Sequence, residues 1–273
     1  MEYEYIELSV EDDVGKITLD RAEKRNAIVP ELALEVTDAL ERIEDEIRVL
    51  VLEGNGSAFC AGMDLEKRFY ETRQEGPRAF YEAGRKTGSM FTTLFDYNRP
   101  TVAKIDGWTF GAGYCLQAVC DFAVTTEESV FGLSEINFGI IPGGGAMWAA
   151  VNTMNRRKAL YYTSTGESFT GATAEELGAV TTAVPEDKLE ETTDELIESL
   201  AEKNPIAMQF NTAVLERVRY MDFHEALDYE RGKSEEMKYY QQDEWVDEGI
   251  GQFKEREYKP GLESYDEQSE DSS

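Results

Sequence analysis

The chain has 273 residues and carries 56 aspartates and glutamates against 27 lysines and arginines, a formal net charge of -29. Such a charge repels nucleic acid and anionic membranes, and it is typical of proteins from a salt-loaded cytoplasm, where concentrated cations screen the repulsion. No run of 18 apolar residues is present and the first residues are polar, so we expect neither a membrane span nor a signal peptide. The three cysteines lack zinc-type spacing and predict free thiols in a reducing compartment. We therefore expect a cytoplasmic, halophilic protein; an acidic structural or chaperone-like protein is the alternative that fits the same composition.

The first part of the chain predicts a hairpin, a helix and a buried strand. Residues 5–20 form two alternating apolar runs around an acidic turn, the pattern of a β-hairpin. Residues 30–46 have helical spacing with Pro30 in the first turn, and residues 47–56 read as a buried strand that ends in a turn.

The order of strands and a helix then recurs, which indicates a repeated ββα unit. A second buried strand is predicted over residues 100–108, and it leads into "DGWTFGAGYCLQAVCD", residues 106–121. In this stretch the three small residues 111–113 stand directly before an apolar helix. A third buried strand is predicted over residues 121–133.

Strands nearly vanish after residue 172, and the rest of the chain predicts helices. Residues 186–204 and 223–244 have amphipathic helical patterns. We therefore assign residues 1–195 to a mixed α/β core and residues 196–273 to a helical extension with an acidic tail.

Glycines at two strand-to-helix turns predict a site built from main-chain N–H groups. Glycine lets another group approach the backbone closely, and a helix start offers unpaired N–H groups and the positive end of the helix dipole. The stretch "GSAFCAGMDL", residues 56–65, follows a strand and again places a glycine before a change of direction. Two such turns could each give one N–H to the same oxygen, which is the arrangement of an oxyanion hole. Tight helix packing is the alternative explanation for residues 111–113.

Five stretches together resemble the crotonase, or enoyl-CoA hydratase/isomerase, superfamily. They are "DRAEKRNAI", "FCAGMDL", "DGWTFGAGYCLQAVCD", "FGLSEINFGIIPGG" and "YKPGLESY", in the expected order along essentially the whole chain. Within the superfamily, "AGMDL", "GLSEINFGI", "EKNP" and "KPGL" are most similar to the hydroxycinnamoyl-CoA (feruloyl-CoA) hydratase-lyases. The resemblance implies an α/β fold, a crotonase-like spiral of ββα repeats, and a C-terminal helical region that builds trimers, often paired into hexamers.

The resemblance also implies which residues carry the reaction. The N–H groups of Met63 and Ala112 would hold the thioester oxygen while an enolate forms, and Glu135 would carry the proton. Taken alone, Glu135 would read as a solvated or helix-capping acid. A second glutamate of the hydratases falls on Cys115; a thiol with a pKa of about 8.5 is a poor acid at neutral pH, and buried cysteines usually only pack. Both roles stay open for Cys115, with packing favoured over catalysis.

The residues that would bind the acyl group depart from the lyase pattern. Two tyrosines that grip a para-hydroxyl group in the lyases fall on Arg68 and Arg231, while Tyr70 and Tyr229 stand two residues away. If the arginines face the substrate, they favour an acyl group with an anionic tail or a phenolate; surface ion pairs are the alternative. Phe138 is expected to line the same pocket.

Coenzyme A enters as part of the substrate, and no separate cofactor is expected. By resemblance Lys24 would meet its nucleotide, the backbone around Ala61, Met63 and Leu65 would hold the pantetheine and adenine, and Lys259 would add a charge. A solvated turn is the alternative for Lys24.

Other catalytic motifs are missing from the sequence. The single histidine, His224, leaves a Ser-His-Asp triad or a multi-histidine metal site without its residues. The glycine-rich stretches fit neither a phosphate loop nor a dinucleotide turn. We therefore expect neither a metal nor a nicotinamide cofactor.

The sequence thus predicts an acyl-CoA lyase that hydrates an α,β-unsaturated acyl-CoA, with retro-aldol cleavage to an aldehyde and acetyl-CoA left open as a second step. A Δ3,Δ2-enoyl-CoA isomerase and a noncatalytic acyl-CoA-binding subunit are the alternatives. The expected partners are the acyl-CoA and further copies of the chain in a homotrimer or a hexamer, with neither nucleic acid nor a membrane.

Overall fold

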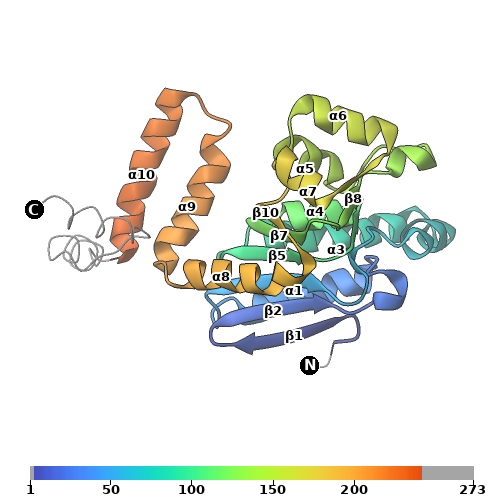
Figure 1. Ribbon diagram of the computed structural model, residues 1–273, viewed down its shortest axis with the longest axis horizontal. Helices are drawn as coiled ribbons and strands as arrows, with labels where there is room; N and C mark the ends of the chain where they lie inside the picture. The colour runs from blue at the N-terminus through green and yellow to red at the C-terminus, as the bar shows by residue number, and fades with distance from the viewer. Residues whose placement is uncertain (1–2, 242–273) are drawn as a thin grey trace, which may run out of the picture. The chain divides into compact units, whose positions relative to one another are not determined.

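The computed structural model describes residues 3–241, which form two compact units (Figure 1). The first unit ends at Lys203 and the second begins at Asn204. The boundary predicted after residue 195 lies within helix α8 (Leu189–Ala201). No helix in the described part of the chain is long and apolar enough to cross a membrane.

The first unit is built on two β-sheets. The larger sheet has the strand order β1-β2-β3-β5-β7-β10, in which the β1–β2 pair is antiparallel, as the predicted hairpin requires, and the other pairs are parallel. The smaller sheet has the order β4-β6-β8-β9, and its only antiparallel pair is β8–β9. The strands are β1 (Ile6–Glu11), β2 (Val14–Leu19), β3 (Val49–Gly54), β4 (Ala58–Cys60), β5 (Thr101–Ile105), β6 (Trp108–Phe110), β7 (Phe122–Thr126), β8 (Val130–Gly132), β9 (Ser168–Thr170) and β10 (Thr182–Val184).

The chain alternates between the two sheets, which confirms the predicted spiral of ββα repeats. Strand β3 leads to β4, β5 to β6 and β7 to β8, and in each pair the second strand belongs to the smaller sheet. The single strand predicted at residues 100–108 is therefore β5 followed by the first residue of β6, and the one predicted at residues 121–133 is β7 followed by β8. The turn between β5 and β6 depends on Gly107, which has φ +76° and whose Cβ, if present, would lie 2.2 Å from the carbonyl oxygen of Ser57.

Helices follow the strand pairs and cover the sheets. They are α1 (Pro30–Ile43), α2 (Thr72–Glu75), α3 (Pro77–Phe95), α4 (Ala112–Ala118), α5 (Ala146–Thr153), α6 (Arg156–Thr165), α7 (Gly171–Leu177) and α8 in the first unit, with α9 (Pro205–Val218) and α10 (Phe223–Gln241) in the second. Short segments of other helical type are η1 (Ala22–Lys24), the π-helical η2 (Glu66–Glu71), η3 (Glu135–Phe138) and η4 (Glu186–Lys188).

Helix α3 packs against α1 and was not expected from the sequence. Helix α1 buries Leu32, Val36 and Leu40 on one face, at the spacing of an amphipathic helix. The buried residues of α3, from Ala83 to Leu94, also have the spacing of an amphipathic helix, although Gly84 and Gly88 lower its intrinsic helix propensity. The apolar spacing in the sequence was therefore a signal for α3 that was overlooked.

Helix α4 is anchored in the aromatic core. The ring of Tyr114 is fully buried and meets Phe131 and Phe169 edge to face, with centroids 6.4 and 6.2 Å away. Its hydroxyl group lies 2.6 Å from Oγ1 of Thr153 on α5. This packing fixes the start of α4, where the small residues 111–113 lie.

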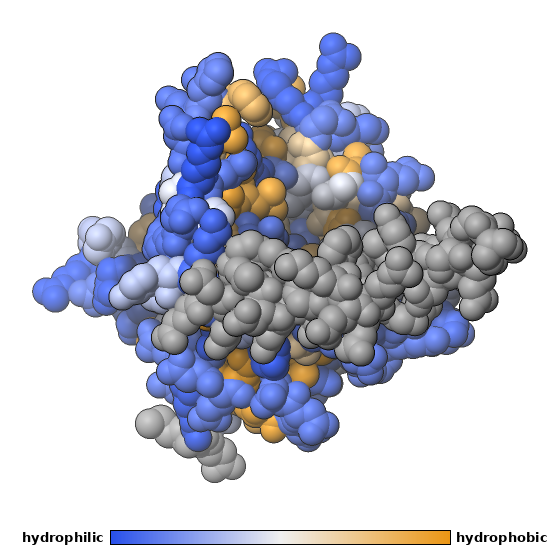
Figure 2. Space-filling model, turned by 90° about the vertical axis from the view of Figure 1, so that its left-hand side faces the viewer, coloured by the Kyte–Doolittle hydropathy of each residue, from blue (hydrophilic) through white to orange (hydrophobic). Residues whose placement is uncertain are grey.

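The second unit consists of α9 and α10, which run side by side (Figure 1). Several large apolar side chains of these helices are exposed, among them Leu215, Phe223 and Tyr239. Figure 2 shows hydrophobic residues in patches between polar ones on the face that it presents. Assembly through the helical region stays a prediction.

Candidate active site

A cavity of about 920 Å³ in the first unit brings together most of the residues singled out in the sequence. It is lined by Met63, Ala112, Cys115 and Glu135, and also by Ala61, Leu65, Arg68 and Phe138. Most of the other lining residues are glycines and apolar side chains. Among the lining residues Glu135 is the only carboxylate, and Arg25 and Arg68 are the only cations. The cavity is therefore mainly apolar, with three charged side chains in its lining.

Met63 and Ala112, which both line the cavity, lie on two turns that are close in space. Gly62 has φ +94°, and a Cβ on it would lie 2.7 Å from the carbonyl oxygen of Phe110 and 3.3 Å from the amide nitrogen of Ala112. The turn before Met63 therefore lies close to the start of α4. Within the described chain the N–H groups of Met63 and Ala112 donate no hydrogen bond. Their role as the two donors of an oxyanion hole stays a prediction.

Backbone pairing directs the amide of Met63 away from the neighbouring strand segment. The N–H of Ile28 donates to the carbonyl oxygen of Gly62 at 2.8 Å, and the N–H of Asp64 donates to the carbonyl oxygen of Ile28 at 3.0 Å. In this parallel bridge the bonds use the residues on either side of Met63. The N–H of Met63 itself is left available.

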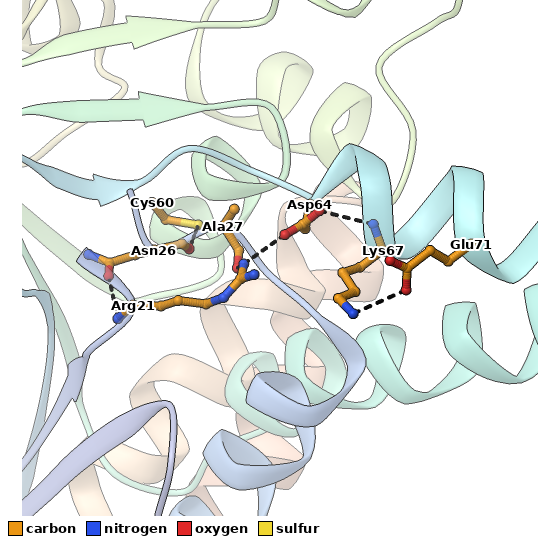
Figure 3. A network of polar contacts seen from close by, with 7 residues as sticks. All are labelled: Arg21, Asn26, Ala27, Cys60, Asp64, Lys67 and Glu71. Atoms are coloured by element: carbon orange, nitrogen blue, oxygen red, sulfur yellow. Dashed lines mark hydrogen bonds and ion pairs between the residues drawn. The ribbon is translucent and has the colours of Figure 1, made fainter. Parts of the chain in front are cut away.

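A buried ion pair holds the same turn in place (Figure 3). The carboxylate of Asp64 lies 2.8 Å from Nη1 of Arg21, and the two side chains are 9% and 11% exposed. Nη1 of Arg21 also donates to the carbonyl oxygen of Ala27, and the N–H of Lys67 donates to Oδ1 of Asp64. Burial alone would raise the pKa of Asp64, but the hydrogen bond from Lys67 and the charge of Arg21 outweigh it and lower this pKa.

Asn26 completes this network from the other side. Its Nδ2 donates to the carbonyl oxygens of Asn55 and Ala58, and its Oδ1 accepts from the N–H of Arg21. The thiol of Cys60 donates to the carbonyl oxygen of Asn26 at 3.2 Å (Figure 3). The "KRNA" segment and the "FCAG" segment are thereby locked to each other.

Glu135 stands at the start of η3 with its carboxyl group close to Gly111. A Cβ on Gly111 would lie 2.8 Å from Oε1 of Glu135, so a side chain at Gly111 would occupy the place of this carboxyl group. Oε2 of Glu135 is buried without a hydrogen-bond partner in the described chain. Burial raises the pKa of Glu135. A carboxyl group with a raised pKa and one oxygen free of a partner in the described chain is suited to accept and return a proton.

Cys115 lies on α4 with its thiol against Gly145. A Cβ on Gly145 would lie 2.5 Å from Sγ of Cys115, and this glycine has φ +93°. Burial raises the pKa of the Cys115 thiol to about 12. The thiol is therefore protonated at neutral pH, and a catalytic role for Cys115 stays a prediction.

Arg68 lines the cavity from segment η2. Its Cζ lies 4.2 Å from the ring centroid of Phe80 and 5.3 Å from that of Phe69. Tyr70, two residues on, is 67% exposed and does not line the cavity. The structure thus places Arg68, and not Tyr70, at the cavity wall.

Tyr229 and Arg231 belong to α10 of the second unit. Tyr229 is half-buried there, and Arg231 is exposed with its Nη1 3.7 Å from Asp228. Their predicted roles in substrate binding stay predictions.

The residues expected to meet coenzyme A are only partly at the cavity. Ala61 and Leu65 line it, whereas Lys24 is exposed on η1 and does not. Lys259 lies outside the described residues. The role of Lys24 stays a prediction.

Arg25 is a lining residue that sequence reasoning missed. Its Cζ lies 5.0 Å from the ring of Trp108, which in turn stacks on Phe110 at 5.1 Å. Arg25 has a left-handed backbone conformation, with φ +51°. The basic pair in "EKRNA" was the available signal, but the sequence does not show that Trp108 lies opposite it.

Comparisons with known proteins identify the family of the chain. The model of the family described as enoyl-CoA hydratase/isomerase matches residues 9–263. The hydroxycinnamoyl-CoA hydratase-lyase of Pseudomonas fluorescens is 37% identical over 265 residues, 95% of this chain and 96% of that protein. The 2,3-dehydroadipyl-CoA hydratase of Escherichia coli K12 is 30% identical over 217 residues, 79% of this chain and 83% of that protein.

Solved structures show the same fold. The enoyl-CoA hydratase of Polaromonas sp. JS666 superposes with a TM-score of 0.85 at 26% identity, covering 92% of this chain and 97% of that chain. The enoyl-CoA hydratase of Bacillus anthracis superposes with a TM-score of 0.84 at 28% identity, covering 93% and 97%. These findings confirm the resemblance that the motifs indicated. The chain is an enzyme of the enoyl-CoA hydratase/isomerase, or crotonase, family.

Proposed function

We propose that this enzyme hydrates an α,β-unsaturated acyl-CoA and then cleaves the β-hydroxyacyl-CoA into an aldehyde and acetyl-CoA. The observation that carries the proposal is that Glu135, whose Oε2 is buried without a partner in the described chain, lines one apolar cavity together with Met63 and Ala112, whose N–H groups donate no hydrogen bond there. Similarity to the hydroxycinnamoyl-CoA hydratase-lyase supports the second step and an aromatic acyl group.

In the hydration step Glu135 acts first as a base and then as an acid. Its carboxylate takes a proton from water while the water oxygen bonds to the β-carbon. The electrons of the double bond move to the thioester oxygen, and the N–H groups of Met63 and Ala112 stabilise this enolate. Glu135 then returns the proton to the α-carbon. A preset donor of this kind lowers the barrier by about 3 to 4 kcal/mol where its loss has been measured.

The cleavage step uses the same groups. Glu135 takes the proton of the β-hydroxyl group, the bond between the α- and β-carbons breaks, and the β-carbon leaves as an aldehyde. The bonding electrons again form an enolate at the two N–H groups. Protonation of its α-carbon by Glu135 gives acetyl-CoA, so no oxidant, metal or further cofactor is consumed.

The thiol of Cys115 has no proton-transfer role in either step. A pKa of about 12 keeps it protonated, and its tight packing against Gly145 supports a structural role instead. One carboxyl group is enough, because each step moves a single proton to and from the same face.

Coenzyme A is proposed to bind as part of the substrate, through the backbone around Ala61, Met63 and Leu65, with Lys24 near the nucleotide. The strong negative charge supports work in a salt-loaded cytoplasm, where cations screen the repulsion between the protein and this polyanion. We further propose that the helical region builds trimers or hexamers; the exposed apolar side chains of α9 and α10 support this.

The test is to incubate the protein in molar KCl with crotonyl-CoA and with 4-coumaroyl-CoA and to identify the products by mass. The proposal expects water added to the enoyl-CoA, and an aromatic aldehyde with acetyl-CoA from the second substrate. A separate incubation with a Δ3-enoyl-CoA tests the isomerase alternative. Its conversion to the Δ2 isomer without hydration would show an isomerase instead. Tight binding of every thioester without turnover, unaffected by Glu135→Gln, would show a noncatalytic binding subunit.

A further inference from the structure

The guanidinium group of Arg68 is fixed in the cavity wall by packing. It stacks on Phe80 and lies near Phe69, and a Cβ on Gly84 would lie only 2.6 Å from its Nη2. The glycine at position 84 of α3 therefore makes the room that this side chain fills. An arginine packed against aromatic rings loses little further freedom when it binds a ligand.

This guanidinium group lacks a partner although acidic residues are abundant. The chain has 56 acidic residues, yet among the described residues none lies within ion-pair distance of Arg68. The adjacent Lys67 does pair, with Glu71 at 3.1 Å. Nη1 of Arg68 is buried and has no hydrogen-bond acceptor among residues 3–241. Burial lowers the pKa of Arg68, but a guanidinium group keeps its charge at neutral pH.

An unmet donor on a partly buried cation costs free energy that an incoming acceptor would recover. The other lining cation, Arg25, is exposed over Trp108, where a strongly hydrated phosphate could remain in contact with water. Arg68 lies instead among phenylalanine side chains, with Phe91 also lining the cavity. Its surroundings suit the apolar acyl chain better than the phosphates of coenzyme A.

We propose that Arg68 binds an anionic oxygen, a carboxylate or a phenolate, at the end of the acyl group remote from the thioester. This inference rests on the proposed function, because it takes the ligand to be an acyl-CoA. Arg68 is then a specificity-determining residue: it selects acyl groups that end in such an oxygen over those that end in a methyl group or an unsubstituted ring.

The test uses saturated acyl-CoAs, which can bind but cannot be hydrated. One pair is hexanoyl-CoA and adipyl-CoA, which have six-carbon acyl chains and differ in the terminal carboxylate. The other pair is 3-phenylpropanoyl-CoA and 3-(4-hydroxyphenyl)propanoyl-CoA, which differ in the phenolic oxygen. Their dissociation constants are measured by calorimetry at one fixed KCl concentration for the natural protein, Arg68→Gln and Arg68→Lys.

We expect Arg68→Gln to weaken binding of the oxygen-bearing member of one pair by about tenfold or more, the usual value for a hydrogen bond to a charged group. Weaker binding of adipyl-CoA in the first pair would identify a carboxylate as the group that Arg68 binds. Weaker binding of the hydroxyphenyl compound in the second pair would identify a phenolate. Binding of the unsubstituted member should hold, which also shows that the variant is folded. Arg68→Lys, which keeps the charge but loses the planar fork, should show a smaller loss. The matched control is Arg73→Gln, on exposed α2 outside the cavity lining.

The inference is overturned if Arg68→Gln changes both members of each pair equally, or weakens the binding of free coenzyme A. Because these ligands do not react, this result is independent of catalysis. A protein that discriminates within a pair through Arg68 but hydrates no enoyl-CoA would refute the proposed function alone. Hydration without such discrimination would refute the role of Arg68 alone.

Discussion

The carboxyl group of Glu135 occupies space that the missing side chain of Gly111 leaves open. A Cβ atom at Gly111 would lie 2.8 Å from Oε1 of Glu135, and Gly111 also adopts φ +53° and ψ -114°. The same glycine directly precedes Ala112, which lines the cavity. One small residue therefore leaves room for the proposed proton carrier and adjoins one of the two N–H groups that are proposed to hold the enolate.

The change Gly111→Ala should reduce kcat/KM by about a hundredfold, the effect expected of a displacement of catalytic groups by about 1 Å. The matched control is Gly76→Ala, because Gly76 has φ +108° but no atom within 4 Å of an added Cβ. The control carries backbone strain without the contact to Glu135. Equal activity of the two variants would show that the contact has no catalytic importance.

The raised pKa of Glu135 predicts a specific pH dependence of stability. The folded chain holds the proton more tightly than the unfolded chain, so the contribution of Glu135 is favourable below the ordinary pKa near 4.5 and is lost as pH rises through the raised value. Glu135→Gln should therefore have the same free energy of unfolding as the natural protein at low pH. At pH 7 it should be more stable by about 1 kcal/mol, a small value because the side chain is partly exposed.

Urea unfolding of both proteins at one protein concentration, from pH 4 to pH 8, measures this difference. The difference in the free energy of unfolding should grow as pH rises. A difference that is the same at every pH, or that shrinks with rising pH, contradicts a raised pKa for Glu135.

The ion pair between Arg21 and Asp64 should be important for stability and for the position of Met63. Asp64→Asn leaves a buried cation unpaired and should lower the free energy of unfolding by about 3 kcal/mol. Glu71→Gln removes the pair between Lys67 and Glu71, whose side chains are 52% and 44% exposed, and should lower the free energy of unfolding far less than Asp64→Asn does, because exposed ion pairs contribute little. Asp64→Asn should also lower kcat more than it raises KM, because the oxyanion donors act mainly in the transition state.

Denaturant unfolding and steady-state kinetics of these two variants test the assignment. If Asp64→Asn and Glu71→Gln lower the free energy of unfolding by the same small amount, the buried pair does not hold the turn. A loss of stability in Asp64→Asn with unchanged kcat would separate the ion pair from the site.

Cys115 should prove unreactive and replaceable. Its thiol has a pKa of about 12, so alkylation by iodoacetamide at pH 7.5 should be far slower than for a free thiol with a pKa of about 8.5. Cys115→Ser is expected to keep kcat/KM within about tenfold, since the loss of a proton-transferring group would cost about a hundredfold or more. Rapid alkylation of Cys115, or a loss of activity as large as that of Glu135→Gln, would assign it to catalysis.

The main features of the fold and the site could be predicted, for identifiable reasons. The hairpin at residues 5–20 and the helix starting at Pro30 have clear periodicity, and the glycines at positions 62 and 111 mark the two turns. Glu135 could be singled out only through its motif, because one acid among 56 carries no signal of its own.

Other features depend on contacts that sequence patterns do not record. The turn that separates β5 from β6 depends on the close approach of Gly107 to Ser57, which the sequence does not show. The position of Arg68 against Phe69 and Phe80, and of Arg25 over Trp108, likewise depends on tertiary packing.

The most direct test of the central claim is the rate of hydration of crotonyl-CoA by the natural protein, by Glu135→Gln and by the matched control Glu128→Gln, whose residue is exposed between β7 and β8. The loss of the enoyl-thioester absorbance gives kcat/KM for each. Glu135→Gln should lower kcat/KM by about a hundredfold to ten-thousandfold, while Glu128→Gln should have the same kcat/KM as the natural protein. Equal hydration by all three proteins would contradict the assignment of Glu135 as the proton carrier and, with it, the proposed reaction centre.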